Sequence, residues 1–301
     1  MSGQERRWLA CHALGVSSAA LLAHPELYGR PEVQALFRRR EAGEPVQYIL
    51  GEAPFFGRDF HVGPGVLIPR QDTETLITAA LELNLSARAT RRAPNDEPFT
   101  FLDWGTGSGC IAATLLLERP KSRALMVDRS PTALNYAREN LERYGLRPDG
   151  QPTRTDRFAA LCRSAVSEGS VGRFPEAEVR ARLIQSGTPE DILLSEEERC
   201  ALVISNPPYI PGGEIPGLMR EVRDHEPREA LDGGQDGMDY YRMLFRCSPR
   251  WLRPGGFLIL EMGSAAQAEA FRASPPPGFG LLREFQDDGG NPRCAVWQYL
   301  V

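Results

Sequence analysis

The sequence lacks the features that mark membrane-spanning, secreted and zinc-binding proteins. In its 301 residues no apolar stretch approaches the roughly 20 residues of a membrane span. Residues 1–5 do not open a charged-then-apolar signal peptide. None of the six cysteines belongs to a CxxC pair and the four histidines show no metal-ligand spacing, which argues for free thiols in a reducing compartment. We therefore expect a cytoplasmic protein, or one of an organelle matrix, that binds no metal.

A surplus of positive charge is also missing. The formal net charge is −5, whereas non-specific nucleic-acid binding needs clustered lysines and arginines. The run Arg38-Arg39-Arg40 is better interpreted as the solvated end of a helix. With 42% hydrophobic and 25% charged residues, the composition is that of an ordinary globular protein with room for two modest domains. We expect neither a membrane nor a nucleic acid as a direct partner.

The most informative motif is Asn206-Pro207-Pro208-Tyr209. It follows the apolar run 201–205, which has the pattern of a buried strand, and two prolines without an N–H group end the sheet pairing. Asn206 therefore stands at the carboxyl end of a strand, where open α/β sheets bind their ligands. Its carboxamide oxygen and a proline carbonyl provide two hydrogen-bond acceptors, with an aromatic ring beside them. This set is suited to holding a planar NH2 group with its nitrogen aimed at an electrophile, although a simple strand-ending turn has the same sequence.

A glycine loop at residues 105–109 is the second motif. A strand at 99–102 precedes it and an apolar helix at 110–118 follows. Glycines let the backbone turn sharply near a ligand, and a helix N-terminus favours an electronegative group. The spacing is GxGxG, not the GxGxxG of dinucleotide folds. Asp128, which ends the next predicted strand, could accept hydrogen bonds from both ribose hydroxyls of a nucleoside.

The chain is expected to divide into three parts. Residues 1–45 have helical periodicity and form a small domain that docks a partner or covers the site. Residues 46–70 suggest a β-hairpin linker that starts with a strand at 48–51. Residues 71–301 form an α/β domain, with a polar insertion of weak periodicity at about 147–180.

The α/β domain is predicted from alternating strand and helix patterns. Asp72 could cap the helix that it opens. A terminal antiparallel hairpin would make the sheet mixed. The predicted elements are helices at 72–83, 131–144 and 240–252, strands at 124–128, 181–186, 203–205 and 257–261, a turn at 253–256, and the hairpin strands 281–286 and 294–300.

These residues together resemble the PrmC/HemK family, the protein-(glutamine-N5) methyltransferases that act on peptide chain release factors. The resemblance extends over nearly the whole chain and includes residues 44–51, 67–70, 225–228 and 230–234 besides the two motifs. It implies an α/β fold of the class I S-adenosylmethionine-dependent methyltransferases, Rossmann-like, after a small helical domain. It also implies methylation of the glutamine in the Gly-Gly-Gln motif of class I release factors.

The resemblance assigns roles to the two motifs. S-adenosyl-L-methionine would be the cofactor, and Asp128 would take its ribose. The cofactor-binding residues would be Asp103, Gly105, Thr106, Gly107, Ser108, Gly109, Asp128 and Asn206. The substrate glutamine would be held by the catalytic residues Asn206, Pro207, Pro208 and Tyr209.

The sequence departs from the family pattern in the adenine region. Thr188 occupies the position of an acid that usually lies near the adenine, and Asp191 or Glu190 could substitute for it. The family's helix-opening Pro-Glu is replaced by Gln71-Asp72, and the insertion is longer than usual. Gly233-Gly234-Gln235 also spells the substrate motif within the enzyme itself, and we interpret it as a glycine turn, not as a site of self-methylation.

Three alternatives stay open at this point. An adenine-N6 methyltransferase uses a similar motif on an exocyclic NH2, but it must flip a base out of a duplex and usually has a basic groove. A glutamine methyltransferase of a ribosomal protein would need the same chemistry. An inactive cofactor-binding module is supported only by the missing adenine-side acid.

Overall fold

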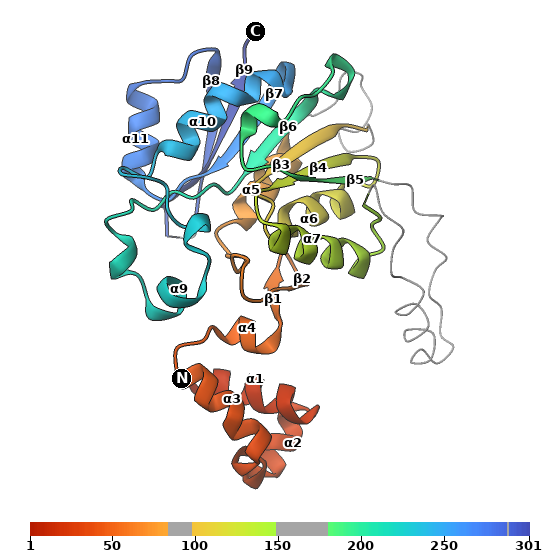
Figure 1. Ribbon diagram of the computed structural model, residues 1–301, viewed down its shortest axis with the longest axis vertical. Coiled ribbons are helices and arrows are strands. Elements are labelled where there is room, and N and C mark those ends of the chain that lie inside the picture. The colour runs from red at the N-terminus through yellow and green to blue at the C-terminus, as the bar shows by residue number, and fades with distance from the viewer. Residues whose placement is uncertain (84–97, 149–179, 288) are drawn as a thin grey trace.

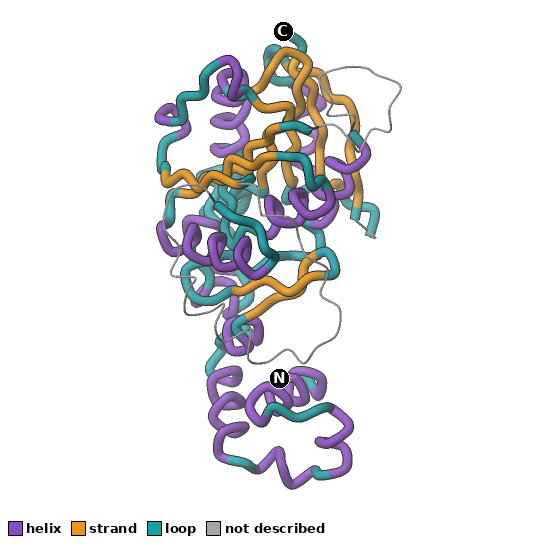
Figure 2. Tube along the Cα trace, turned by 90° about the vertical axis from the view of Figure 1, so that its right-hand side faces the viewer, coloured by secondary structure: helices purple, strands orange, loops and turns teal. Residues whose placement is uncertain are grey.

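The computed structural model describes residues 1–83, 98–148, 180–287 and 289–301. Figure 1 shows a group of helices at the N-terminal end, a short hairpin in the middle and a larger sheet domain that ends with the C-terminus. The side view in Figure 2 shows the same succession along an elongated molecule. No described helix combines the length and apolar character needed to cross a membrane.

The N-terminal helices enclose a small core of their own. They are α1 (Gly3–Leu14), α2 (Ser18–Ala23), a 3-10 turn (Pro25–Gly29), α3 (Pro31–Glu41) and α4 (Val46–Leu50). Leu9, Leu21, Val33 and Phe37 are buried between them. Ser2 caps α1 through a capping box with Glu5, which satisfies two backbone donors at once.

The strand predicted at residues 48–51 is wrong, because Val46–Leu50 forms helix α4. Ile49 packs on the N-terminal core, while Tyr48 packs on the following segment and its hydroxyl donates to the Val66 carbonyl over 2.6 Å. The hairpin follows one element later, as β1 (Glu52–Phe55) and β2 (Arg58–His61). The three-part division of the chain stays a prediction.

The large sheet is mixed, as predicted. Its strand order is β5-β4-β3-β6-β7-β9-β8. The first five of these strands run parallel, and β9 pairs antiparallel with β7 on one side and with β8 on the other, so that β9 alone runs in the opposite direction. Their bounds are β3 (Thr100–Trp104), β4 (Arg123–Asp128), β5 (Ala181–Gln185), β6 (Cys200–Ser205), β7 (Leu252–Glu261), β8 (Phe279–Gln286) and β9 (Pro292–Tyr299). The chain leaves β3 toward β4 and returns to β6 on the other side of β3, so the carboxyl ends of β3 and β6 flank the switch point where such sheets bind ligands.

Helices cover both faces of this sheet (Figure 1). α5 (Glu74–Glu82), α6 (Cys110–Glu118) and α7 (Pro131–Arg143) share one core with Phe101, and α10 (Asp239–Cys247) and α11 (Ala265–Ala273) share another with Leu102. Phe101 and Leu102 are neighbours on β3, and alternation along the strand sends them to opposite faces. A further short helix, α9 (Arg220–His225), lies toward the N-terminal helices.

Two predictions around α10 need correction. The helix ends at Cys247, not at Leu252, because Ser248–Arg250 forms a 3-10 turn at a proline that cannot continue an α-helix. The predicted turn at 253–256 lies within β7 as an irregularity: the pairing jumps from Cys200 with Leu252 to Leu202 with Phe257.

The predicted cap of α5 is also wrong. Thr73 occupies the N-cap position and makes no side-chain capping bond. The Asp72 carboxylate pairs instead with Arg293 at 3.2 Å. The predicted insertion at 147–180 lies almost entirely outside the described residues.

Candidate active site

The glycine loop connects β3 to α6 at the carboxyl ends of the parallel strands, where such sheets bind ligands. Gly105, Gly107 and Gly109 have φ of 71°, 56° and 77°, a region that residues with a Cβ rarely adopt. A Cβ on Gly109 would lie 3.0 Å from the Met126 side chain and 3.1 Å from the Ala137 backbone. Glycine is therefore required there both by backbone conformation and by the close approach of α7.

Asp103 lies behind this loop. It is fully buried, and its Oδ2 accepts a 2.7 Å hydrogen bond from the Thr106 hydroxyl. Burial, with a smaller contribution from the nearby charge of Asp128, raises the pKa of Asp103 to about 7, although hydrogen bonds from Thr106 and the Ala112 backbone lower it. Since Asp103 is not among the residues that line the adjoining cleft, its contact is with the loop.

Asp128 ends β4 at the same edge. Its Oδ2 accepts from the Gly107 N–H and its Oδ1 from the Ser130 N–H, both over 2.9 Å. Burial raises the pKa of this carboxyl, and the backbone hydrogen bonds lower it. Each carboxylate oxygen has a second lone pair, so the group can also accept from hydroxyls in the cleft that it lines.

Asn140, a buried residue that was not predicted from the sequence, holds the glycine loop through side-chain hydrogen bonds. Asn140 of α7 donates through Nδ2 to the carbonyls of Ser108 and His61, over 2.9 and 3.0 Å, and accepts from the His61 N–H over 2.6 Å. This residue joins the hairpin to the glycine loop. Its only sequence signal is a polar residue on the apolar face of a helix.

Asn206 follows β6 and faces the glycine loop across the switch point. Its Nδ2 donates to the Thr73 hydroxyl over 3.1 Å, which leaves Oδ1 as a hydrogen-bond acceptor. Asn206 lines the cleft beside Gly105, Gly107 and Asp128, and it also lines a smaller hollow on its other side. Asn206 is thus one of the residues that line both cavities.

The larger cavity brings residues of both predicted motifs together. It encloses about 790 Å³ of empty space, a figure that includes the part open to solvent. Of the predicted site residues, five line it: Gly105, Gly107, Asp128, Asn206 and Pro208. Tyr209 lines the smaller hollow. The others, Asp103, Thr106, Pro207, Ser108 and Gly109, do not line the larger cavity.

The smaller hollow is lined mainly by apolar side chains. Leu67, Ile210, Val222 and Leu231 contribute to it together with Arg70. The Arg70 guanidinium is held by the buried Glu226 carboxylate at 2.5 Å, and the second oxygen of Glu226 accepts from the Ile68 N–H over 3.2 Å. This ion pair ties the 67–70 segment to the segment that contains Pro227.

The NPPY segment is packed against glycines that leave no room for a side chain. A Cβ on Gly233 would lie 2.8 Å from Tyr209 Cα and 2.9 Å from the Pro208 carbonyl oxygen, and one on Gly263 would lie 2.2 Å from the Tyr209 ring. The Gly233 N–H also donates to the Ile210 carbonyl over 2.8 Å. Gly233-Gly234 thus forms a tight turn beneath NPPY, and the side chain of Gln235 after it is exposed.

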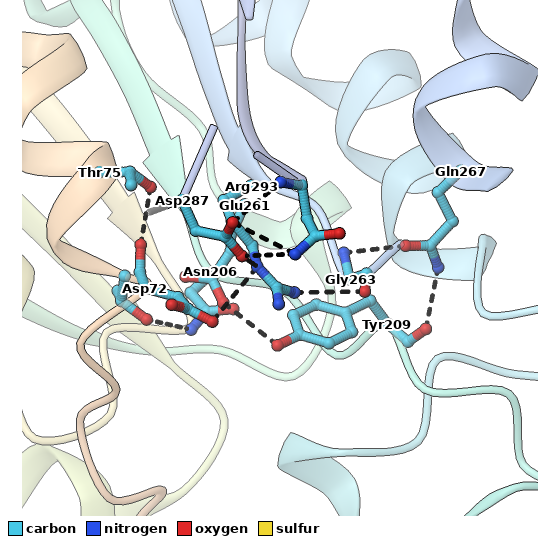
Figure 3. A network of polar contacts seen from close by, with 11 residues as sticks. Asp72, Thr75, Asn206, Tyr209, Glu261, Gly263, Gln267, Asp287 and Arg293 are labelled. Atoms are coloured by element: carbon cyan, nitrogen blue, oxygen red, sulfur yellow. Dashed lines mark hydrogen bonds and ion pairs between the residues drawn. The ribbon is translucent and has the colours of Figure 1, made fainter. Parts of the chain in front are cut away.

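Tyr209 is anchored at both ends (Figure 3). Its hydroxyl donates to Glu261 Oε1 over 3.2 Å, and its carbonyl accepts from Gln267 Nε2 over 2.9 Å. Burial raises the pKa of Tyr209 well above its ordinary value. Burial likewise raises the pKa of Glu261, to about 7, although the hydrogen bond from the Tyr209 hydroxyl acts in the opposite direction. Glu261 ends an apolar strand as Asp128 does, a signal that the sequence analysis overlooked.

The adenine-side substitutes proposed from the sequence lie away from the cleft. Ser186 and Gly187 form the wall in this region, and neither Glu190 nor Asp191 lines it. Asp191 accepts a hydrogen bond from the Thr188 hydroxyl, and Glu190 pairs with Arg246 at 3.2 Å. Among the described residues no group of histidine, cysteine, aspartate and glutamate could hold a metal ion.

The sheet order, the glycine loop, the acid-ended second strand and the NPPY segment at the switch point together define a class I S-adenosylmethionine-dependent methyltransferase. Solved structures support the fold: the hMettl16 catalytic domain, in complex with a MAT2A 3'UTR hairpin, aligns with a TM-score of 0.50 at 14% identity, covering 82% of this chain and 77% of that one.

Comparisons of the sequence identify the family. The chain is 37% identical to a release factor glutamine methyltransferase of Geobacter sulfurreducens, over 97% of this chain and 87% of the relative. It is 38% identical to one of Cereibacter sphaeroides, over 88% and 79%. Residues 2–51 match the PrmC N-terminal domain, and residues 90–165 match the methyltransferase small domain. The chain belongs to the family of release factor glutamine methyltransferases, which confirms the resemblance inferred from its motifs, with S-adenosylmethionine as methyl donor.

Proposed function

We propose that the protein methylates the side-chain amide nitrogen, N5, of the glutamine in the Gly-Gly-Gln loop of class I peptide chain release factors. The observation that carries this proposal is that Asn206 lines both cavities, with its Nδ2 bound to Thr73 and its Oδ1 left to accept. The larger cavity takes S-adenosylmethionine, and the smaller one takes the glutamine side chain.

On the cofactor side, the chain supplies hydrogen-bonding groups at the ends of β3 and β4. S-adenosylmethionine provides an electrophilic methyl group on a sulfonium when bound. Asp128 accepts from the ribose hydroxyls, and the glycine loop lets the cofactor approach the backbone closely. Of the predicted cofactor residues that do not line the cleft, Asp103 and Thr106 act by holding the loop from behind.

On the substrate side, the task of the chain is alignment. An amide nitrogen is a poor nucleophile because its lone pair is delocalised into the carbonyl. Asn206 Oδ1 and the Pro207 carbonyl each accept one N–H of the glutamine amide and point its nitrogen at the methyl group. Such positioning contributes on the order of 7 kcal/mol to lowering a barrier.

The same acceptors stabilise the positive charge that builds up on the nitrogen. The proton leaves to water after methyl transfer, so no general base is assigned. The Tyr209 ring forms a wall of the glutamine hollow, with its hydroxyl held by Glu261. Apolar walls from Leu67, Ile210 and Leu231 suit the methylene groups of a glutamine side chain.

The proposal extends to partner and compartment. The N-terminal helices would dock the release factor. The net charge of −5 supports a reaction without direct nucleic-acid contact, and the bacterial relatives support a cytoplasmic site of action.

Mass spectrometry of a release factor, incubated with the protein and S-adenosylmethionine, tests the function. One added methyl on the glutamine of Gly-Gly-Gln is expected, and none on a matched release factor that carries Gly-Gly-Ala. Cofactor binding without any methyl on the release factor would contradict the proposal and direct the assay to ribosomal proteins and oligonucleotides.

A further inference from the structure

Helix α9 forms part of the wall of the smaller hollow although it contributes no residue to a core. It consists of the 6 residues Arg220–His225, and none of them is buried. Val222 nevertheless lines the hollow. A helix this short is not stable by itself in water, so the position of this wall depends on the contacts that α9 makes with other parts of the chain.

One of these contacts lies at the carboxyl end of α9. Glu226, which follows the helix, is buried and pairs with Arg70 at 2.5 Å. This ion pair ties the end of the helix to the 67–70 segment, which forms another wall of the hollow.

The other contact joins α9 to the N-terminal helices. The Arg40 guanidinium, at the end of α3, pairs with Glu221 of α9 with 2.6 Å between Nη1 and Oε2. Beside this pair the backbone of Gly43 approaches Arg220 so closely that a Cβ would lie 3.0 Å from its Nε. Figure 1 shows α9 on the side of the sheet domain that faces these helices.

Arg40 is suited to hold α9 in one place because its own guanidinium is fixed on more than one side. Its Nε donates to Glu5 of α1 over 2.8 Å, and its Nη1 also donates to the Glu44 carbonyl over 3.3 Å. Its side chain is 17% exposed, and charges that are partly buried are screened less by salt than exposed ones. The planar fork of an arginine that is already ordered loses little freedom when it binds one more carboxylate.

We propose that Arg40 is a positioning residue: by binding Glu221 it fixes α9, and with it Val222, as a wall of the hollow that takes the substrate side chain. The N-terminal helices thus shape the hollow in addition to docking a partner. The inference rests on the proposed function for the identity of the side chain in the hollow, whereas the contact between α3 and α9 can be tested without it.

Hydrogen exchange of the α9 backbone amides, measured by mass spectrometry on the full-length protein, tests this contact without turnover. Arg40→Gln lies in α3, so any change in α9 is transmitted, and we expect exchange there to be about fivefold faster, the upper range for one ion pair at a surface. Arg39→Gln is the matched control, because Arg39 pairs with Glu44 within the N-terminal helices. Unchanged exchange in Arg40→Gln, or equal acceleration in both variants, would overturn the proposal.

Two further variants separate the ion pair from the stability of the N-terminal helices. Glu221→Gln breaks the pair from the side of α9 and should accelerate exchange as much as Arg40→Gln does. Glu5→Gln removes the other carboxylate partner of Arg40, while a glutamine can keep the capping box, and exchange in α9 should stay as in the wild type. Equal acceleration in Glu5→Gln and Arg40→Gln would contradict the role of Glu221.

A double-mutant cycle on KM for the release factor distinguishes shaping of the hollow from docking. Val222→Ala removes the side chain that α9 contributes to the wall, so loss of the Arg40 pair then has little left to displace. Glu221→Gln should raise KM about fivefold in the wild type but about twofold or less in Val222→Ala, since coupled positions are not additive. Equal increases in both backgrounds would overturn the proposal. At saturating release factor kcat should be retained, because ground-state and transition-state binding weaken alike.

The exchange and methylation readouts also separate this inference from the proposed function. Faster exchange in Arg40→Gln, without methylation of the release factor by the wild type, would support the positioning of α9 and reject the substrate. Methylation together with unchanged exchange would support the function and overturn the role of Arg40.

Discussion

The two halves of the site are positioned in different ways. In the cofactor half, the bonds made directly by the loop span at most a few tens of positions: Thr106 with Asp103 over 3, Gly107 with Asp128 over 21 and Ser108 with Asn140 over 32. In the NPPY half, Asn206 bonds to Thr73 over 133 positions and Tyr209 to Glu261 over 52. One half depends on local backbone conformation, and the other depends on how distant elements pack. Changes in the two halves should therefore separate cofactor binding from turnover.

Replacement of Asn206 should give the largest effect. Asn206→Ala removes an acceptor that acts in the transition state, and we expect kcat to fall about 10²- to 10³-fold, by analogy with the loss of one oxyanion-hole donor. Cofactor affinity, measured by calorimetry, should change little. Parallel losses of kcat and cofactor affinity would contradict the division of the site into two halves.

Replacement of Asp128 should affect the other half. Asp128→Ala removes the acceptor for the ribose hydroxyls, and hydrogen bonds to a charged group contribute about 1.5–3 kcal/mol each, so the cofactor Kd should rise at least tenfold. At saturating cofactor, kcat should be largely retained. Asp128→Asn, which keeps one acceptor oxygen, serves as the control and should lie between the wild type and Asp128→Ala.

A substitution at Gly233, which packs against the NPPY segment, should also separate the NPPY half of the site from the cofactor half. Gly233→Ala places a methyl group against Tyr209 Cα and the Pro208 carbonyl, and such overpacking costs about 1–3 kcal/mol. Urea unfolding should show this loss, together with a lower kcat and an unchanged cofactor Kd. Gly213→Ala is the matched control, because a Cβ there meets nothing within 4 Å. Equal stability of the two variants would count against the packing argument.

The smallest effect is expected from the pH dependence of stability. The folded-state pKa of Asp103, about 7, exceeds its ordinary value of 3.8, so the folded protein binds the proton more tightly and the contribution of this group to stability falls as pH rises from about 4 to 7. Asp103→Asn removes the titration. The free energy of unfolding of Asp103→Asn, taken relative to that of the wild type, should therefore increase from pH 5 to pH 8.

Asp287→Asn provides the control for that measurement. The pKa of Asp287 is lowered to about 2 by hydrogen bonds from Asn291 and Arg293, so the carboxyl is ionised in both the folded and the unfolded protein above pH 5. Its replacement should change stability by the same amount at pH 5 and pH 8. A constant difference for Asp103→Asn as well would show that Asp103 does not titrate in this range.

Much of the fold was predictable because its signals are local. The helix at 110–118 has the predicted bounds, and the parallel strands and the terminal hairpin follow from apolar runs with clear ends. Predictions were wrong where competing local signals were close in strength. In Val46–Leu50 an apolar segment that resembled a strand became a helix, because burial on two neighbouring cores required its side chains at helical spacing.

The sequence by itself determined the family, the order of the elements and the residues of the two motifs, because glycine conformation, proline chemistry and strand ends are properties of short segments. Only the tertiary structure decided that Thr73 and Glu261 stand behind Asn206 and Tyr209 and that Gly233 lies beneath NPPY. The physical reason is that hydrogen-bond direction and close packing depend on which distant elements meet, and no short segment contains that information.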